Sequence, residues 1–423
     1  MIHKNLLYWK KNSQPPLKEA ALVSTIFFIV RYTGLWRTEN NFKKHPLTLF
    51  ALFCYFGSYV FQTIALFLFK DDIKHLFEVF SVISFCGMGI LKLFSLDHNS
   101  EHWISLLAKI NVLEEGQHKY DDHVSTVEYE SDSEADNNQV VNLTTVYTKK
   151  FKRAATILCR MYSFTGLVFI ISPFIEYVFE LFSGKTPDKY PHILPSWNPF
   201  DSVHFICYIA IVLCETVAAI YCVCIHIAFD LTVIGVMIFI SGQFSTLIYQ
   251  SERIGGKGNV CCLSKRRDVR AHARIIHCHR FHIQLINDLD CLLKNILGFY
   301  FFLATLTLCS VAVRLKSEQM GAMQLVSLLQ YMCATLTQLY IYCSYGDDVY
   351  NQSSVSAGQG PFGAAIWCLS PRIRREIVML GFGMIKHRRL HAGLFHTVDL
   401  PSFIQIGRAA YSYYAVLGNN KPE

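Results

Sequence analysis

The densest group of side chains able to bind a metal ion lies in one basic segment: His272, His277, Cys278, His279 and His282. Arginines alternate with three of these histidines, at Arg270, Arg274 and Arg280. Their positive field opposes a bound cation, and neither a Cys-x-x-Cys nor a His-x-x-Glu-His spacing accompanies them. The segment is therefore interpreted as a solvated basic helix, and no metal site is predicted.

Other reactive side chains do not form a catalytic pattern. The sequence has no phosphate-binding glycine loop, no Gly-x-Ser-x-Gly and no Cys–His arrangement typical of a nucleophile and its base. Cys261 and Cys262 lie beside basic residues, where palmitoylation is one interpretation and reduced cytosolic thiols are the favoured one. We predict no enzyme activity and no cofactor.

The composition is that of a chain embedded in lipid. Of the 423 residues, 52% are hydrophobic and only 17% are charged, and the chain holds 32 Phe and 22 Tyr. The formal net charge of +7 comes from basic residues between apolar segments. Cytoplasmic loops of membrane proteins have this pattern, so nucleic-acid binding is not expected.

The apolar segments predict an all-α, polytopic fold with seven transmembrane helices. Residues 20–30 are too short to span and are expected to form an interfacial helix. The seven predicted spans are 46–69, 75–96, 154–182, one long helix from Ser202, 289–313, 320–344 and 403–417. This gives three regions: a cytoplasmic N-terminal segment (1–45), spans one to six (46–344), and a C-terminal region with the last span (345–423).

Charge bias sets the orientation. Apolar residues from Ser202 to Tyr249 are long enough for two spans, but two spans would place the most basic loop outside the cell. One span is therefore predicted, which leaves the N-terminus cytoplasmic and the C-terminus extracellular. The acidic run 121–138 lacks apolar periodicity and is expected to be a disordered loop. Glu215, within the long fourth helix, is the expected buried polar partner, whereas Lys92 is expected toward an inner helix end.

The C-terminal region carries a recognisable series of motifs. It runs Tyr345-Gly346, Trp367, Ala392-Gly393-Leu394-Phe395 and Tyr411-Ser412-Tyr413. This order resembles the C-terminal signature of the insect odorant receptors. Residues 358–361, Gly-Gln-Gly-Pro, stand before the tryptophan and are expected to interrupt a helix.

The resemblance implies a ligand-tuning subunit that forms a ligand-gated, non-selective cation channel with the odorant coreceptor as a hetero-tetramer. It also implies the plasma membrane of an olfactory neuron dendrite and a small volatile odorant as ligand. Mapping the family's outer pocket onto the predicted spans gives these ligand-binding candidates: Phe80, Ser84, Phe169, Pro173, Tyr177, Tyr208, Val212, Gln324, Ser327, Leu328 and Tyr331. The last four share one helical face.

The last span is implied to line the pore. Its candidate pore-lining residues share a face: Gln405, Ala409, Ser412 and Val416. Three alternatives stay open. A gustatory-type receptor channel would end in different motifs, a G-protein-coupled receptor would have the opposite topology, and a transporter would show an inverted repeat.

Overall fold

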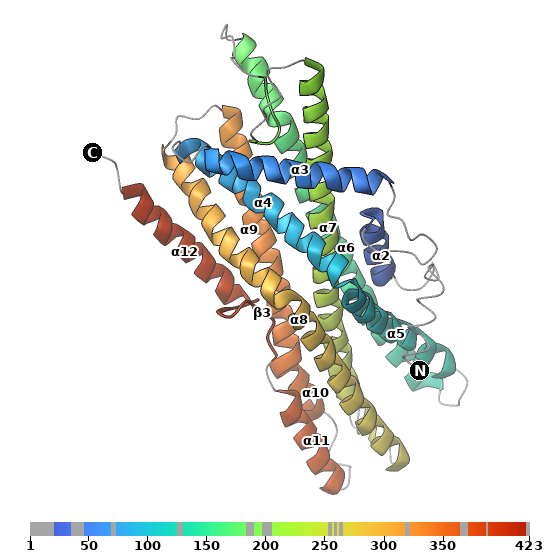
Figure 1. Ribbon diagram of the computed structural model, residues 1–423. Coiled ribbons are helices and arrows are strands. Elements are labelled where there is room, and N and C mark those ends of the chain that lie inside the picture. Colours follow the sequence, from blue (N-terminus) through green and yellow to red (C-terminus); the bar gives the residue numbers. More distant parts are fainter. Residues whose placement is uncertain are drawn as a thin grey trace.

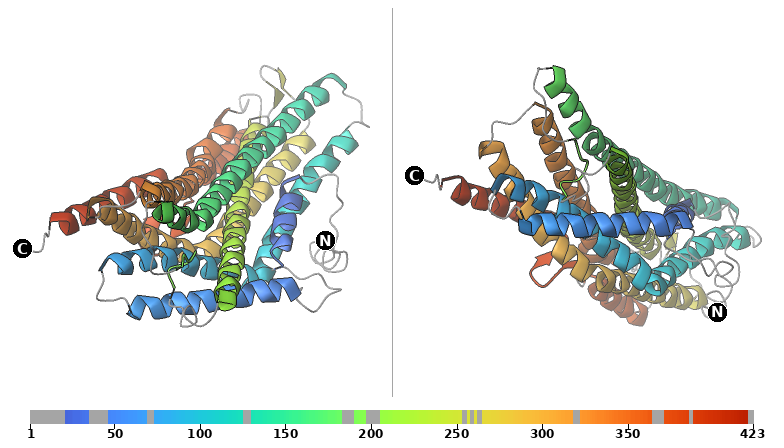
Figure 2. Two further views of the ribbon diagram at one scale, coloured as in Figure 1. Left: turned by 90° about the horizontal axis from the view of Figure 1, so that it is seen from above. Right: turned by 45° about the horizontal axis from the view of Figure 1, so that its top comes forward.

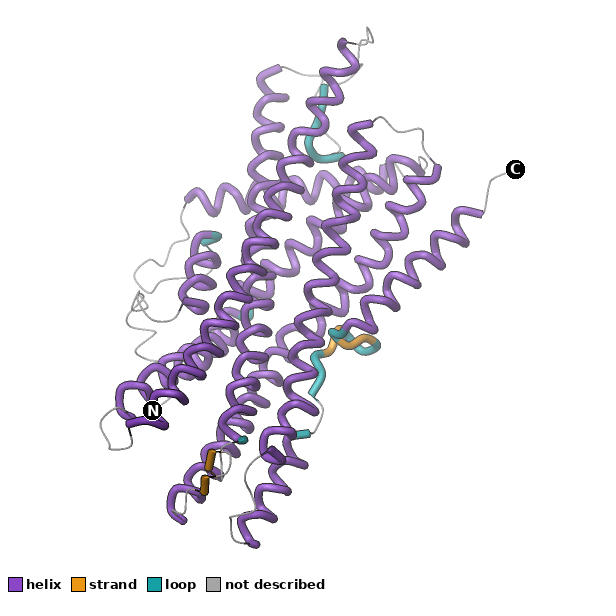
Figure 3. Tube along the Cα trace, turned by 180° about the vertical axis from the view of Figure 1, so that it is seen from behind, coloured by secondary structure: helices purple, strands orange, loops and turns teal. Residues whose placement is uncertain are grey.

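The protein is an elongated assembly of long helices in the computed structural model (Figure 1). The structure describes residues 21–34, 46–68, 73–124, 130–182, 190–196, 205–252, 256–257, 260–261, 265–317, 322–363, 371–385 and 388–419. Within these ranges the strands form two short antiparallel hairpins (Figure 3). One pairs β1 (Gly256–Lys257) with β2 (Val260–Cys261), and the other pairs β3 (His391–Ala392) with β4 (His396–Thr397). The all-α prediction is confirmed.

Each predicted span corresponds to a helix. The helices are α2 (Ala21–Tyr32), α3 (Pro46–Leu68), α4 (Ile73–His98), α5 (Ser100–Val124), α6 (Glu130–Phe182), α7 (Phe205–Ser251), α8 (Lys265–Ser317), α9 (Ala322–Asn351), α10 (Ala357–Gly363), α11 (Pro371–Met384) and α12 (Leu400–Asn419). Among the described residues, α3, α4, α6, α7 and α8 contain stretches long and apolar enough to cross a bilayer. With α9 and α12 they make the seven long helices of the predicted spans.

The long fourth apolar region is one helix, as predicted. α7 runs unbroken from Phe205 to Ser251. α6 and α8 are much longer than the predicted spans, at 53 residues each. A helix of that length measures about 80 Å, against a hydrocarbon core about 30 Å thick. Both therefore continue well beyond the apolar stretch, because the polar sequence next to each span keeps helical propensity.

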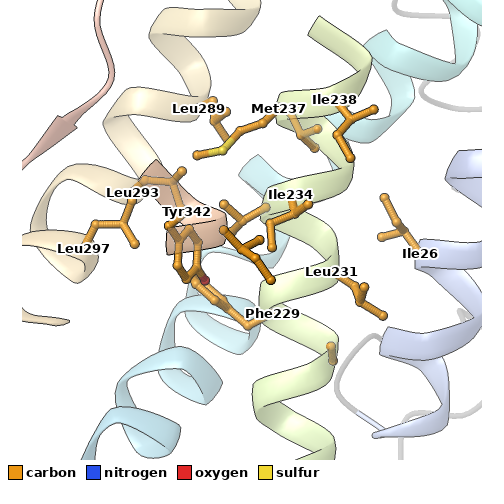
Figure 4. Packing of buried hydrophobic residues seen from close by; sticks show 14 of the residues in the cluster. Ile26, Phe229, Leu231, Ile234, Met237, Ile238, Leu289, Leu293, Leu297 and Tyr342 are labelled. Carbon is orange, nitrogen blue, oxygen red and sulfur yellow. The ribbon is translucent and has the colours of Figure 1, made fainter. Parts of the chain in front are cut away.

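The core is organised around α7, which packs against α2, α3, α4, α6, α8 and α9. In one strongly apolar 18-residue stretch of this helix 83% of the residues are buried. Figure 4 shows the packing, with Met237 facing Leu289, Leu231 facing α2, and Phe229 beside Tyr342. A helix that is apolar all round is expected to be enclosed by neighbours. α7 is thus the central helix of the fold.

Two expectations about loops were wrong. Asp121–Val124 ends α5 and α6 begins at Glu130, so most of the acidic run 121–138 is helical, while residues 125–129 lie outside the described ranges. Acidic residues in a first turn are stabilised by the helix dipole, and this local effect compensates for the missing apolar periodicity.

Residues 358–361 also lie within a helix. α9 continues through a π-helical turn (Gln352–Ser356) into α10, which contains Pro361. A side chain at Gly360 would meet Ser251 Oγ at 1.9 Å and the backbone of Ile248. The glycine therefore permits α10 to pack closely on the end of α7, and this tertiary contact outweighs the low helix propensity of the stretch. Trp367 lies outside the described residues.

α12 is placed by the β3–β4 hairpin (β3, His391–Ala392; β4, His396–Thr397). Gly393, with φ of +71°, makes the turn, and its backbone lies against Gly298 of α8, where a side chain would be 2.5 Å from the Gly393 Cα. α12 then runs along α8 and α9 at one edge of the bundle (Figure 2). The close approach fixes the start of the last helix relative to α8.

Candidate functional site

One ligand-binding candidate on α9, Tyr331, contacts α4 inside the bundle. The Tyr331 hydroxyl donates a hydrogen bond to the Ser81 carbonyl oxygen, 3.2 Å away. The Tyr331 ring also meets Phe85 edge to face, with centroids 6.4 Å apart. Ser84 is buried on the same helix as Phe85, and Leu328 is buried one turn before Tyr331. Tyr331 thus contacts span two through Ser81 and Phe85, two residues that the sequence analysis did not name.

A second group of candidates meets at the ends of α6 and α7. Tyr190, in the segment between these helices, lies 6.5 Å from the Tyr177 ring and 5.0 Å from the Tyr208 ring, between centroids. The Tyr208 hydroxyl donates to the carbonyl oxygen of Pro191 at 2.9 Å. Sequence reasoning missed Tyr190, and its position in an aromatic-rich connection was the available signal.

The remaining ligand-binding candidates belong to the same helices. These side chains are half-buried: Phe80, Phe169, Pro173, Val212 and Ser327. The Gln324 side chain lies outside the described residues. Half-buried apolar side chains on the facing helices suit a small apolar ligand held by dispersion and desolvation.

A buried ion pair joins α4 to α7. Lys92 Nζ donates to Asp230 Oδ1 at 2.5 Å, and the two side chains are 2% and 0% exposed. The carboxylate also accepts hydrogen bonds from Tyr162, from Gln338 at 2.9 Å and from Tyr342 at 2.6 Å. A buried charge is tolerated when it is paired and its other lone pairs are satisfied. Four helices, α4, α6, α7 and α9, meet at this one carboxylate.

His226 connects the ion pair to the candidate pocket. Its Nδ1 lies 3.0 Å from Lys92 Nζ and its Nε2 lies 3.2 Å from the Phe85 carbonyl oxygen. An ammonium group only donates, so Nδ1 accepts, and Nε2 carries the proton and donates to Phe85. The imidazole also stacks on the Phe85 ring, with centroids 4.2 Å apart.

The expectations for the charged residues of the spans need correction. Lys92 lies toward the end of α4, as expected, but its ammonium group is fully enclosed and paired with Asp230. Glu215 is buried as expected, yet its partners belong to a loop and not to another helix. It accepts hydrogen bonds from the backbone N–H of Ile193 at 3.1 Å and from Ser196 Oγ at 3.1 Å. An acid and a base within separate spans were the signal for the Lys92–Asp230 pair.

The described pore-lining candidates, Gln405, Ala409 and Ser412, lie on one face of α12 that points away from the bundle. Gln405 and Ser412 are exposed and Ala409 is half-buried, whereas Ile406 and Ala410 pack inward. The side chain of Val416 lies outside the described residues. A 20-residue helix with an exposed polar face fits a position where copies of α12 surround water.

The start of α12 is held by Asp399. The Ser402 backbone N–H donates to Asp399 Oδ1 at 3.0 Å and the Thr397 hydroxyl donates to Oδ2 at 2.6 Å. Burial raises the pKa of Asp399, but these hydrogen bonds and the charge of Arg389 outweigh it, so the pKa lies below its ordinary value. Asp399 and Gln405 line a polar hollow of about 240 Å³ between the hairpin and the end of α9.

The basic segment of α8 is only partly solvated. His282 is buried at 4% exposure and packs on Phe244, with ring centroids 5.3 Å apart. Burial and the charge of Arg388 lower the pKa of the neighbouring His279. The solvated-helix interpretation is therefore wrong for these two residues, because α8 turns this face toward α7. Within the described residues, no group of His, Cys, Asp and Glu is arranged to hold a metal ion.

Long apolar helices around an enclosed polar centre define a multi-pass membrane protein. A family model described as 7tm Odorant receptor matches residues 72–411. The chain belongs to the insect odorant receptor family, and its resemblance over residues 345–417 is thereby confirmed.

Relatives from Drosophila melanogaster match at low identity. Odorant receptor 45a is 28% identical over 33% of this chain and 36% of its own, and Odorant receptor 13a is 26% identical over 44% and 47%. The chain thus spans less than half the length of these two relatives. Putative odorant receptor 92a is 21% identical over 90% of this chain and 89% of its own.

The fold matches a solved receptor. The olfactory receptor OR5 from Machilis hrabei, in complex with eugenol, superposes with a TM-score of 0.73 at 16% identity, over 94% of this chain and 98% of that one. The protein has an odorant receptor fold, and its family consists of sensory receptors and not of enzymes.

Proposed function

We propose that this chain is the ligand-binding subunit of an odorant-gated, non-selective cation channel. In this proposal it assembles with the odorant coreceptor as a hetero-tetramer in the plasma membrane of olfactory neuron dendrites, with the N-terminus cytoplasmic and the C-terminus extracellular. The observation that carries it is the double role of α9. This helix holds the candidate ligand residue Tyr331 and also packs on α12, where Tyr340 meets Phe403 at 5.8 Å between ring centroids.

The proposed ligand is a small, mostly apolar volatile molecule. It binds among α4, α6, α7 and α9, next to Phe80, Ser84, Phe169, Tyr177, Tyr208, Val212, Gln324, Ser327 and Tyr331. In this proposal the apolar rings bind the ligand by dispersion contacts, and the hydroxyls of Ser84 and Tyr331 orient a polar group of the ligand by hydrogen bonding. Tyr331 already donates to Ser81, so a ligand that accepts its hydrogen bond must replace that partner.

The proposed pore is formed by α12 from four subunits. Gln405, Ala409, Ser412 and Val416 face the axis, and close approach of the small apolar side chains excludes water when no ligand is bound. The inward face of α12, with Ile406 and Ala410, rests on α8 and α9. A movement of these two helices therefore moves the pore face.

The test is a current recorded from cells that express this chain with and without the coreceptor. A panel of volatile phenols, esters and alcohols that includes eugenol is applied while G-protein turnover is blocked with GDP-βS. We expect a cation current that needs both subunits and persists under the block. The absence of current at normal surface density, or its loss under the block, would contradict the proposal.

A further inference from the structure

The Asp230 carboxylate has no lone pair left for another donor. Oδ1 accepts from Lys92 and Tyr342, and Oδ2 accepts from Tyr162 and Gln338. A carboxylate offers about four acceptor sites in total. A further hydrogen bond to Asp230 therefore requires that one of the present donors leaves.

A fifth donor lies beside this carboxylate. Tyr300 of α8 is 6% exposed, and within the described residues its hydroxyl has no hydrogen-bond partner in the protein. Its ring centroid is 5.8 Å from that of Tyr342 and 5.8 Å from Lys92 Nζ. A buried hydroxyl without a partner costs free energy, so an arrangement that gives Tyr300 an acceptor regains it, while the donor that leaves incurs a similar cost.

We propose that Asp230 is the centre of a two-position switch, in which the tyrosine of α9 and the tyrosine of α8 exchange as its donor. In the present arrangement Tyr342 holds α9 to α7. In the second arrangement Tyr300 takes its place and holds α8 to α7, while Tyr342 is released. This inference rests on the proposed function, because it assigns the first arrangement to the closed channel and the second to the open one.

The switch is linked to the candidate pocket through aromatic contacts. Tyr331 meets Phe85, Phe85 stacks on His226, and His226 accepts from Lys92, the partner of Asp230. Tyr331 also belongs to α9, seven residues before Gln338 and eleven before Tyr342, so these three side chains share one helical face. A ligand that displaces Tyr331 from Ser81 therefore acts on the same helix face that Asp230 holds.

The switch is linked to the proposed pore through α9 and α8, the two helices that carry the exchanging tyrosines. α9 supports α12 by the contact of Tyr340 with Phe403. α8 supports the start of α12 by the packing of Gly298 on Gly393 and by Phe301, whose ring lies 6.3 Å from that of His396. Gln338 keeps its bond from α9 to Asp230 in both arrangements, so the exchange loosens α9 at Tyr342 and adds a bond from α8. This changes the support of α12. Coupling between the candidate pocket and the proposed pore requires an element with two discrete arrangements, and both sites must shift the equilibrium between them.

The deciding variant is Tyr300→Phe. The Tyr300 hydroxyl has no protein partner in the closed arrangement, so its removal leaves that arrangement intact and the channel reaches the surface. The open arrangement loses a hydrogen bond to a charged group. We expect the open–closed equilibrium to fall about tenfold, which is about 1.4 kcal/mol. The probe is the panel volatile that gives the largest wild-type current, and the readouts are surface biotinylation and maximal current per surface channel.

Tyr342→Phe should act in the opposite direction. It weakens the closed arrangement, so we expect a higher current without ligand and half-maximal activation at a lower probe concentration. The double variant should return toward the wild-type equilibrium, because each arrangement then lacks one hydrogen bond. Tyr221→Phe is the matched control. It removes a buried hydroxyl that donates to the Thr33 carbonyl oxygen at 3.3 Å, away from Asp230, and should shift neither quantity.

An unchanged response of Tyr300→Phe at normal surface density would overturn the exchange, and so would shifts of both variants in the same direction. These outcomes leave the wild-type current in place and therefore contradict only the switch. If the wild-type chain itself gives no current with the coreceptor, the proposed function fails and the switch fails with it.

Discussion

The centre of the bundle and the outer face of α12 both carry polar side chains in an otherwise apolar membrane protein. In the centre, each oxygen of Asp230 has two donors within the chain, and the residue is completely buried. On α12, Gln405 and Ser412 are exposed. The chain thus satisfies one polar site by itself and leaves the other exposed. This difference is consistent with the proposed ligand site within each subunit and the proposed pore between subunits.

The largest expected effect comes from breaking the central ion pair. Asp230→Leu leaves the Lys92 ammonium buried without its counter-charge, and loss of one partner of a buried pair costs about 3–5 kcal/mol. We expect little protein at the surface and a strongly lowered melting temperature in detergent. The double variant Lys92→Met with Asp230→Leu should recover most of the loss. Full stability of the single variant would contradict the buried pairing.

The next largest effect should come from the pore face. Val416→Cys, treated from outside with a charged thiol reagent, should change conductance, because the reagent places charge in a narrow water path. Tyr411→Cys is the control, since Tyr411 is 71% exposed but lies off the proposed pore face. The measurement is single-channel recording with labelling verified by mass shift. Unaltered conductance and ion selectivity in a labelled Val416→Cys channel would show that this face does not line the pore.

Tyr331→Phe probes the candidate pocket and should have a smaller effect. It removes the hydrogen bond to Ser81 and the only polar group of this side chain, a change of about 1 kcal/mol. We expect about a fivefold shift in the probe concentration for half-maximal current, at unchanged conductance. Dose–response curves at matched surface density measure it. A change in ion selectivity with no change in potency would reverse the assigned roles of the two regions.

Glu114 on α5 provides a pH-dependent comparison outside the spans. Burial raises its pKa from 4.5 to about 7, although a hydrogen bond from Tyr147 opposes this. The folded state therefore binds the proton more tightly than the unfolded state. Its stabilising contribution is complete below pH 4.5 and is lost as the pH rises through about 7.

The expected result is a melting temperature in detergent that falls from pH 5 to pH 8 less steeply in Glu114→Gln than in the wild type. Glu114→Gln should also be the more stable form at pH 8, because it avoids a buried charge. Glu101→Gln, which removes an exposed carboxylate from the first turn of α5, is the matched control for the substitution itself. Parallel curves for Glu114→Gln and the wild type would contradict the shifted pKa.

The smallest expected effect tests the topology that the comparison assumes. Asn142 and Asn351 begin glycan acceptor sequences, and the predicted orientation keeps both in the cytoplasm. Treatment with a glycosidase should therefore leave the electrophoretic mobility unchanged. A mobility shift that Asn142→Gln or Asn351→Gln abolishes would place that loop outside the cell.

The sequence by itself determined where the long apolar helices lie. A long segment without charged residues predicted α3. The bias of basic residues toward one side of the membrane predicted that α7 is one helix, as the structure shows. These features are local, because a bilayer of fixed thickness demands apolar length and every span must satisfy its own backbone hydrogen bonds. The motifs from Tyr345 to Leu417 likewise identified the family, since they lie close together in the chain.

Only the tertiary structure decided which polar residues meet. Lys92 and Asp230 are 138 residues apart, and hydropathy gives each of them the same unfavourable value whether it is paired or not. The contact of Gly360 with Ser251 likewise kept residues 358–361 helical against their propensity. A buried charge is tolerated only when distant helices bring donors to it, so its partners depend on how those helices pack and not on the residues beside it.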